Sequence, residues 1–262
     1  MYNSKCGRIN KFLLETRPYG HAIYLDAHPL AVEHLQQLVG GQVTPFHRPG
    51  KQWTHVLVID GPLPEWTFET LQLLNEVVVM QPLSPIASAI AVDWYSTPPT
   101  AEDDSFHQTP MGDRILMSKR MADRIHPPEI ERLQRDVAAD MARTIRRHIA
   151  YRRANVLATS PPHILANHGY AVQLAELIAE ETGLPLVRTV GKTAVRPQRK
   201  EGERVDLEDE FSLDPRRVEG QTVIIVDDVY KQGDTMRGVA AACRRARAAR
   251  ILGLAAARTL SN

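Results

Sequence analysis

The chain has 262 residues, of which 43% are hydrophobic and 24% are charged, and its formal net charge is +1 at pH 7. This apolar content can form the core of one large domain or two small ones, and a charge near zero sets up no overall field that would attract nucleic acid or a membrane. The two cysteines, Cys6 and Cys243, are too few for a disulfide scaffold or a four-cysteine zinc site. No run of about 18 apolar residues is present, and the N-terminal apolar stretch is too short for a secretory signal. We therefore expect a cytoplasmic protein with no membrane partner.

The N-terminal part alternates between two periodicities. Alternating apolar residues and β-branched runs predict strands over residues 22–26, 55–60 and 76–80, whereas apolar residues at threes and fours predict helices over residues 29–39 and 65–75. This rhythm is typical of a small α/β unit.

A polar stretch at residues 96–110 combines proline, serine, threonine and acids. Such a composition is typical of an exposed linker. We therefore place a domain boundary there, which divides the chain into residues 1–110, an α/β unit of unknown role, and residues 111–262, a second domain.

The second domain begins with a long amphipathic helix at residues 127–151, opened by two prolines. A strand, a helix and a strand follow, and this order predicts parallel strands. A charged segment rich in breakers then reads as a long mobile loop, and the chain closes with an all-apolar strand, a helix and a last strand. The predicted ranges of these later segments are 155–160, 169–183, 185–190, 191–213 (the loop), 222–226, 235–248 and 250–260.

The stretch "VIIVDDVYKQGDT" at residues 223–235 carries the chemistry. Ligands of open parallel sheets bind at the carboxyl ends of the strands, and this stretch delivers Asp227 and Asp228 to that edge. The turn that follows leads into a helix, so its backbone N–H groups can converge on an anion at the positive helix end. Gly233 allows close approach, Lys231 adds a cation, and Thr235 supplies a hydroxyl or an N-cap.

Carboxylates beside an anion-binding turn are consistent if the ligand is a sugar phosphate. The turn then binds the phosphate, and the carboxylates accept hydrogen bonds from ribose hydroxyls or face a developing cation. A single acid after a strand is as often a plain turn or helix cap. A nucleotide-hydrolysing phosphate loop is a poor alternative, because "VGKT" at 190–193 is preceded by Leu186 where that motif needs glycine. A receiver-type acidic pocket would not explain the Gly-Thr helix start.

The strand, both acids, Gly233 and Thr235 resemble the phosphoribosyl-diphosphate (PRPP) signature of type I phosphoribosyltransferases. The chain departs from that signature at Lys231 and Gln232, where the family usually has small hydroxyl residues. The resemblance extends over roughly residues 130–260 and is similar to the ComF and amidophosphoribosyltransferase-like branch. The charged loop echoes that branch through its spaced Thr, Gln, Arg and Phe: Thr193, Gln198, Arg204 and Phe211.

The resemblance implies a parallel-sheet, Rossmann-like α/β domain and a glycosyltransferase of nucleotide metabolism that transfers the phosphoribosyl group of PRPP to a nitrogen acceptor. Asp227 and Asp228 would hold the ribose hydroxyls and stabilise positive charge on the ring, and Mg²⁺ would bind mainly through PRPP, with no metal site built from the protein alone. The substrate-binding residues implied for the phosphate turn are Val229, Tyr230, Lys231, Gln232, Gly233, Asp234 and Thr235. Those implied for the leaving pyrophosphate are Ser160, His163, Asn167 and His168 in the loop at 160–169, and Lys192 and Arg204 in the charged loop, which would close as a lid.

Several alternatives stay open. A regulatory protein that binds PRPP or a nucleotide without turnover is compatible with Lys231 and Gln232. A nucleic-acid-associated protein is the less favoured alternative, because arginines on amphipathic helices usually form a solvated face. The arginines concerned are Arg143, Arg146, Arg147, Arg152, Arg153, Arg244, Arg245, Arg247 and Arg250. The residues that recognise the acceptor are not located by the sequence, and a homodimer is compatible with it.

Overall fold

The computed structural model describes residues 6–46, 52–97, 105, 107–121, 124–162, 169–193 and 206–260. Its largest element is a seven-stranded sheet in the order β1-β6-β7-β13-β12-β8-β9. The five strands from β7 to β9 in this order pair in parallel, whereas β6 and β1 add antiparallel strands at one edge. Their bounds are β1 Cys6–Gly7, β6 Val78–Met80, β7 Ser88–Trp94, β8 Val156–Thr159, β9 Leu186–Val187, β12 Thr222–Tyr230 and β13 Arg250–Arg258. The predicted parallel α/β sheet is therefore confirmed.

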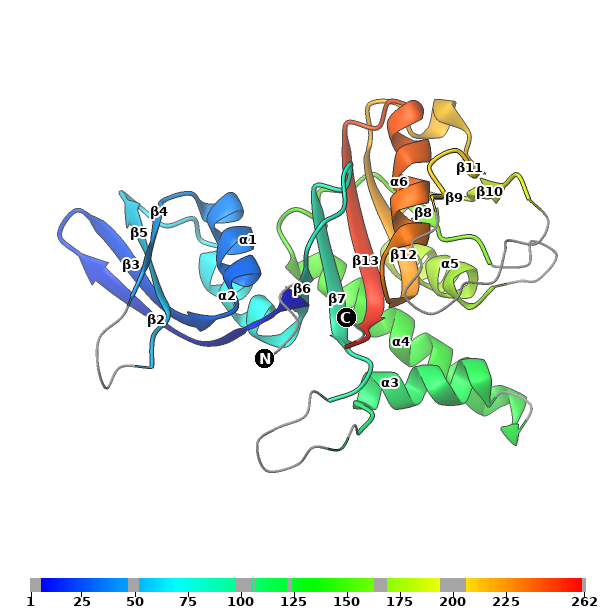
Figure 1. Ribbon diagram of the computed structural model, residues 1–262, viewed down its shortest axis with the longest axis horizontal. Helices are drawn as coiled ribbons and strands as arrows, with labels where there is room; N and C mark the ends of the chain where they lie inside the picture. Colours follow the sequence, from blue (N-terminus) through cyan, green and yellow to red (C-terminus); the bar gives the residue numbers. More distant parts are fainter. Residues whose placement is uncertain are drawn as a thin grey trace.

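Helices cover both faces of this sheet (Figure 1). The helix α6 (Asp234–Arg245) lies on one face, and α4 (Pro127–Arg147) and α5 (Tyr170–Thr182) lie on the other. The central strand β12 is apolar on both sides for this reason: Val223 and Ile225 pack in the core with α6, whereas Ile224 and Val226 pack in the core with α4 and α5. The sheet edge at which β7, β12 and β13 end is flanked by α3 (Pro110–Ile115), which continues into a π-helical turn, η1 (Leu116–Arg120).

A second sheet belongs to the N-terminal part of the chain and is antiparallel throughout, in the order β2-β3-β5-β4. Its strands are β2 Ile9–Arg17, β3 Gly20–Ala27, β4 Gln42–Pro45 and β5 His55–Asp60, and the helices α1 (Pro29–Val39) and α2 (Thr67–Glu76) accompany them. The predicted strands and helices of this region are present, together with β2 and β4, which the sequence did not indicate.

The seven-stranded sheet takes strands from both sides of the predicted boundary at residue 110. The strands β1, β6 and β7 precede that boundary, yet β7 pairs with β13 along six residues of each strand. The division into residues 1–110 and 111–262 stays a prediction about domains, but it does not separate the two sheets.

The predicted mobile loop at 191–213 is described only at its ends. There, β10 (Val190–Gly191) pairs antiparallel with β11 (Phe211–Ser212), and a short 3-10 turn (Pro215–Arg217) leads towards β12. Residues 194–205 between them lie outside the described residues. None of the helices in the part of the chain that the structure describes is long and apolar enough to cross a membrane.

Candidate functional site

The two acids of the motif, Asp227 and Asp228, lie within the C-terminal half of strand β12 and not beyond its end. The sequence predicted that this strand stops at Val226, but the structure continues it to Tyr230, with Asp227 paired to Ala255 and Val229 to Ala257 of β13. The longer strand follows from this pairing, because a neighbouring strand of equal length supplies partners for the extra residues.

Each carboxylate of the pair accepts a hydrogen bond from the amide that follows it. The backbone N–H of Asp228 donates to Oδ1 of Asp227 at 3.0 Å, and the N–H of Val229 donates to Oδ1 of Asp228 at 2.7 Å. These bonds hold both side chains close to the backbone at the carboxyl edge of the sheet, where ligands of open α/β sheets bind.

Lys119 forms an ion pair with Asp228 and is the main functional candidate that sequence reasoning missed. It lies on η1, and its ammonium contacts Oδ2 of Asp228. The side chain of Asp228 is 12% exposed and that of Lys119 is 40% exposed. No local motif could have indicated this residue, because the pair joins positions 109 residues apart.

The turn after β12 has the features that an anion-binding turn requires. Gly233 has φ +78°, and a Cβ at this position would lie 2.2 Å from the phenolic oxygen of Tyr230. The helix α6 starts at Asp234, one residue before the predicted start, and its N-cap Gly233 makes no side-chain capping bond. Lys231 is exposed. The Oε1 atom of Gln232 is buried and has no hydrogen-bond partner among the described residues.

A buried arginine at the end of β13 contacts the residue at which this turn begins. Arg258, at the end of β13, is 3% exposed and donates from Nη1 to the carbonyl oxygen of Tyr230 at 3.1 Å. Its guanidinium carbon lies 5.4 Å from the centre of the Tyr230 ring. Tyr230, which the sequence assigned to substrate binding, is buried beneath the turn.

The loop predicted to bind pyrophosphate is described at its two ends. Ser160 follows β8, its N–H donates to the carbonyl oxygen of Val226 at 3.1 Å, and its hydroxyl is buried with no partner among the described residues. At the other end, a Cβ on Gly169 would lie 2.7 Å from Cβ of Pro162, so the two ends of the loop pack together. The predicted site residues His163, Asn167, His168 and Arg204 lie outside the described residues.

The remaining predicted lid residue, Lys192, is exposed next to β10. Its backbone N–H donates to the carbonyl oxygen of Glu210 at 2.9 Å, and Glu210 also binds Thr193 through its carboxylate. These contacts involve the backbone of Lys192 and not its ammonium, so the role of Lys192 in pyrophosphate binding stays a prediction.

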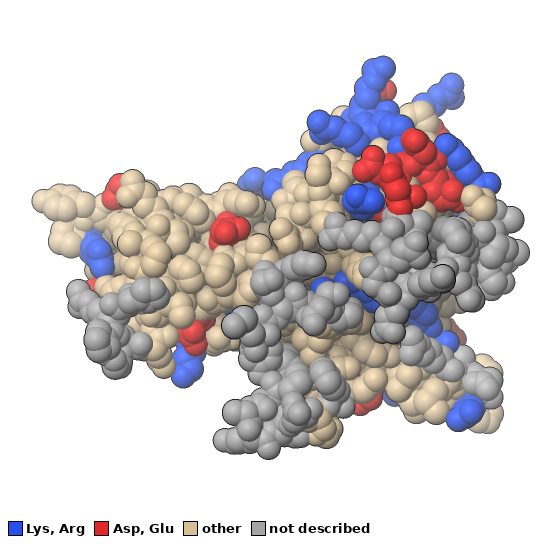
Figure 2. All heavy atoms as spheres, in the orientation of Figure 1, with Lys and Arg blue, Asp and Glu red and all other residues tan. Residues whose placement is uncertain are grey.

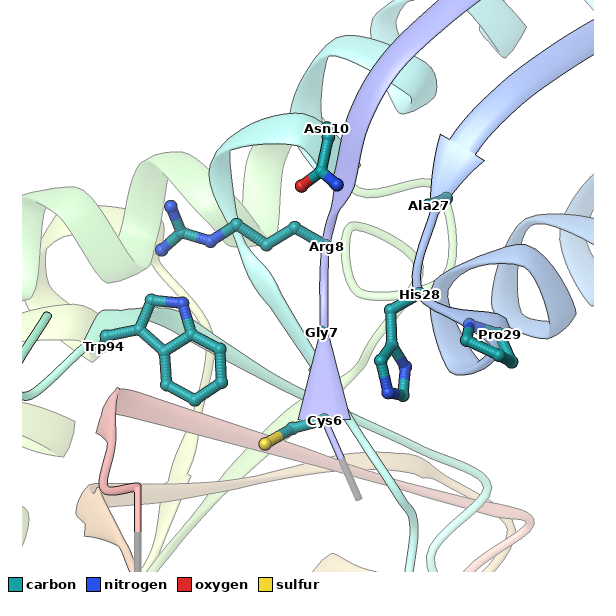
Figure 3. A pocket seen from close by; sticks show the side chains of 8 residues that line it. All are labelled: Cys6, Gly7, Arg8, Asn10, Ala27, His28, Pro29 and Trp94. Carbon is teal, nitrogen blue, oxygen red and sulfur yellow. The ribbon is translucent and has the colours of Figure 1, made fainter. Parts of the chain in front are cut away.

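A cavity of about 440 Å³ lies between the end of β7 and the N-terminal segments β1, β3 and α1 (Figure 3). The sheet register leads from this cavity to the phosphate turn, because Trp94 pairs with Arg258 and Arg258 pairs with Tyr230. His28 caps α1 by accepting from the N–H of Leu30 at Nδ1, and burial lowers its pKa. A neutral His28 therefore keeps its proton on Nε2 as a donor. The lining residues are Cys6, Gly7, Arg8, Asn10, Ala27, His28, Pro29 and Trp94.

Many arginines considered for nucleic-acid binding are engaged with carboxylates. Figure 2 shows acidic and basic side chains intermingled near the end of α6, where Arg245 contacts Asp209. Four more arginines of this set form ion pairs: Arg143 with Asp140, Arg146 with Glu181, Arg147 with Glu76 and Arg247 with Glu219. These contacts neutralise part of the charge that a nucleic-acid surface would use.

The comparison with protein families gives one match. Residues 135–257 match the model of the phosphoribosyl transferase domain, which agrees with the predicted resemblance over residues 130–260. A search of curated proteins returned no match.

Three solved structures show a distant similarity to this chain. UMP synthase of Leishmania donovani is 19% identical (TM-score 0.29), with 57% of this chain and 25% of that chain covered. A purine phosphoribosyltransferase from Pyrococcus horikoshii is 18% identical (TM-score 0.31; 48% and 83% covered), and glutamine PRPP amidotransferase from B. subtilis is 14% identical (TM-score 0.36; 94% and 48% covered). This chain thus spans about a quarter of the first structure's length and about half of the third's. Within residues 135–257, which contain Asp227, Asp228 and the phosphate turn but neither Lys119 nor Arg258, the chain matches a phosphoribosyl transferase domain.

Proposed function

We propose that the protein binds PRPP, or a related ribose 5-phosphate ligand, and transfers the phosphoribosyl group to a nitrogen acceptor. The observation that carries this proposal is the sequence of features along β12 and α6. Two hydrogen-bonded carboxylates at the sheet edge are followed, after Tyr230, by a turn with a left-handed glycine, which is the N-cap of α6. A sugar phosphate is the ligand that uses both halves.

In this proposal the chain binds the ligand at three points. Asp227 and Asp228 accept hydrogen bonds from the ribose hydroxyls, and the backbone N–H groups of residues 231–235 hold the 5-phosphate. The buried oxygens of Gln232 and Ser160, which have no hydrogen-bond partner among the described residues, lie in the turn after β12 and directly after β8, and they can bind ligand hydroxyls or ordered water. A ligand bound here would therefore supply hydrogen bonds that these two buried oxygens lack among the described residues of the free protein.

The reaction is a displacement at C1 of the ribose. The bond from C1 to the diphosphate oxygen breaks with its electron pair leaving on the diphosphate, the bond from C1 to the acceptor nitrogen forms, and the nitrogen loses a proton. Positive charge develops on the ring in the transition state, and the fixed carboxylates of Asp227 and Asp228 stabilise it electrostatically. Positioning by the turn supplies the remaining rate enhancement.

Magnesium suits the oxygen donors of this site. The ion would bind mainly through the phosphate oxygens and hydroxyls of the ligand and through water, and it would neutralise charge on the leaving diphosphate. A cytoplasmic location and a homodimer are part of the same proposal.

We assign the acceptor to the cavity that Trp94 and His28 line. The cavity reaches the carboxyl end of β7 at Trp94, two strands from β12 in the sheet, and its volume falls in the range of small-molecule sites. The indole of Trp94 offers a flat apolar surface, and Nε2 of His28 offers a donor. A planar nitrogen compound fits this combination.

The test is diphosphate release from PRPP and Mg²⁺ by the purified protein with a panel of nucleobases and amines. Replacing both acids, in an Asp227→Asn/Asp228→Asn variant, is expected to lower turnover at least about 100-fold, because each removes a charge-assisted hydrogen bond. Asp60→Asn is the control, since Asp60 is an exposed aspartate at the end of β5 in the other sheet. Undiminished turnover in the double variant would refute the site, and PRPP binding without release for any acceptor would instead indicate a binding protein.

A further inference from the structure

The ammonium of Lys119 occupies the place between the two parts of the proposed ligand site. On one side it pairs with Oδ2 of Asp228, the carboxylate proposed to hold the ribose. On the other side it faces the ring of Tyr170, whose centre lies 5.9 Å away. Tyr170 is the first residue of α5, directly after the loop predicted to bind pyrophosphate. Lys119 therefore lies where the ribose end and the diphosphate end of a ligand would meet.

The segment that carries Lys119 is anchored to α5 on its buried side. Oγ of Ser118 lies 2.6 Å from the phenolic oxygen of Tyr170 and donates to the carbonyl oxygen of Arg114, also at 2.6 Å. Burial raises the pKa of Tyr170 to about 12, the bond to Ser118 opposes this rise, and the negative charge of Asp228 adds to it. Tyr170 is thus a neutral phenol, and Lys119 provides the positive charge at this point.

Both oxygens of Asp228 are engaged in the free protein. Oδ1 accepts from the N–H of Val229, and Oδ2 contacts Lys119. A ribose hydroxyl that binds this carboxylate must therefore compete with the ammonium. Because Lys119 is 40% exposed and has a flexible four-carbon side chain, the ammonium can turn towards solvent once it is displaced. A diphosphate on C1 would meet it there.

We propose that Lys119 leaves Asp228 when the ligand binds and contacts the diphosphate, so that it selects a ribose 5-phosphate carrying a diphosphate over one that lacks it. This inference rests on the proposed function. In the free protein the same lysine neutralises Asp228, and in the complex it neutralises the leaving group. Lys119 therefore strengthens the binding of a ligand that carries a diphosphate and does not strengthen the binding of one that lacks it.

The experiment compares two ligands by calorimetry on the full chain: PRPP with Mg²⁺, and ribose 5-phosphate, which has the sugar and the 5-phosphate only. Lys119→Met is expected to weaken PRPP binding by about 10- to 100-fold, the loss of one charge-assisted contact. The same variant is expected to bind ribose 5-phosphate as tightly as the wild type or more tightly, because nothing then competes for Asp228. Lys119→Arg keeps the charge and should retain most of the PRPP affinity.

Lys11→Met is the control, because Lys11 is an exposed lysine on β2. The inference is supported if Lys119→Met weakens PRPP binding while ribose 5-phosphate binding is unchanged or becomes tighter. It is overturned if both affinities rise, which would mean that Lys119 only blocks Asp228, and equally if both fall together or neither changes. If the wild type binds neither ligand, the proposed function itself fails and this inference fails with it.

Discussion

Gly233 illustrates how one residue shapes the phosphate turn. Its φ of +78° is a conformation that side chains with a Cβ rarely adopt, and the space that a Cβ would need is filled by the phenol of Tyr230. Tyr230 is itself held by Arg258, so the turn rests on a buried tyrosine and a buried arginine. Two separate constraints therefore require glycine at this position.

Gly233→Ala is expected to destabilise the protein more than Gly183→Ala. Gly183 has a similar φ of +72°, but no atom lies within 4 Å of its Cβ position, so that variant measures backbone strain alone. We expect about 1–2 kcal/mol for the strain in both variants and a further 1–3 kcal/mol for the contact with Tyr230. Urea unfolding gives both values, and equal losses would show that the contact with Tyr230 costs nothing.

At the scale of elements, a buried polar network joins four segments on the side of the sheet remote from α6. Nε2 of His34 on α1 lies 2.8 Å from Nε2 of His148, which follows α4, and Oη of Tyr151 donates to the carbonyl oxygens of Ser88 on β7 and Gly253 on β13. The N–H of Ala150 donates to Nδ1 of His148, so a neutral His148 donates from Nε2 to His34. The network ties the N-terminal helix α1 to the seven-stranded sheet.

Tyr151→Phe removes the donor at the centre of this network. The carbonyl oxygen of Gly253, 2.7 Å from the phenol, would lose that hydrogen bond in a buried place, at an expected cost of about 1–3 kcal/mol. Tyr19→Phe, at a tyrosine that is 90% exposed, should change the free energy of unfolding little. Thermal and urea denaturation of the two variants measure these free energies of unfolding. An unchanged free energy of unfolding in Tyr151→Phe would show that the hydrogen bonds of the phenol do not stabilise the fold.

The histidine pair makes stability depend on pH. Burial, with a smaller effect of Arg250, lowers the pKa of His34 from 6.5 to about 4, and burial together with His34 and Arg250 lowers that of His148 well below 6.5. At a pH between about 4 and 6.5 the unfolded chain binds more protons than the folded one. The full free energy of unfolding is therefore present above pH 6.5, and this contribution is lost as the pH falls towards 4. For His34 alone the loss is about 3 kcal/mol.

Urea unfolding from pH 7.5 to about 4.5 measures this slope. His34→Gln is expected to flatten it, whereas His126→Gln, at an exposed histidine, should leave it as in the wild type. A slope that is identical in all three proteins would exclude the histidine pair as its source.

At the scale of the whole molecule, the large sheet is assembled from distant parts of the chain. The parallel strands β8, β9, β12 and β13 come from residues 156–258. The strand β7, which pairs with β13, comes from residues 88–94, and β1 comes from residues 6–7. The site edge is likewise composite, since Trp94, Lys119 and Asp228 come from three separate segments.

A fragment of residues 111–262 is therefore expected not to fold cooperatively. It lacks β7, so β13 would present an unpaired edge and the buried residues that contact β7 would face water. A matched chain in which a short turn joins Gly7 directly to Val78 keeps all seven strands, because these ends are already neighbours in β1 and β6. Circular dichroism with urea unfolding compares the two, and cooperative unfolding of the fragment would refute the expectation.

Part of the fold followed directly from sequence patterns. Residues 29–39 were predicted as a helix with the bounds that α1 has, because its apolar side chains recur at helical spacing and Pro29 opens it. The strand β2 gave no such signal, because most of its side chains are exposed and its apolar residues Phe12, Leu13 and Leu14 are consecutive and do not alternate with polar ones. The strand β7 was missed because it is a short apolar run within a proline-rich stretch, and such runs have no period that separates them from a loop.

By itself the sequence determined that residues 223–235 combine a central strand, two acids and a glycine turn, because these features depend on neighbouring residues and on local backbone preferences. The tertiary structure alone decided that β12 continues through the acids, that Lys119 neutralises Asp228, and that Arg258 supports the turn. The physical reason is the same in each case. Strand pairing, ion pairs and buried hydrogen bonds depend on distances across the fold, and residues far apart in sequence leave no periodic pattern that reveals their contact.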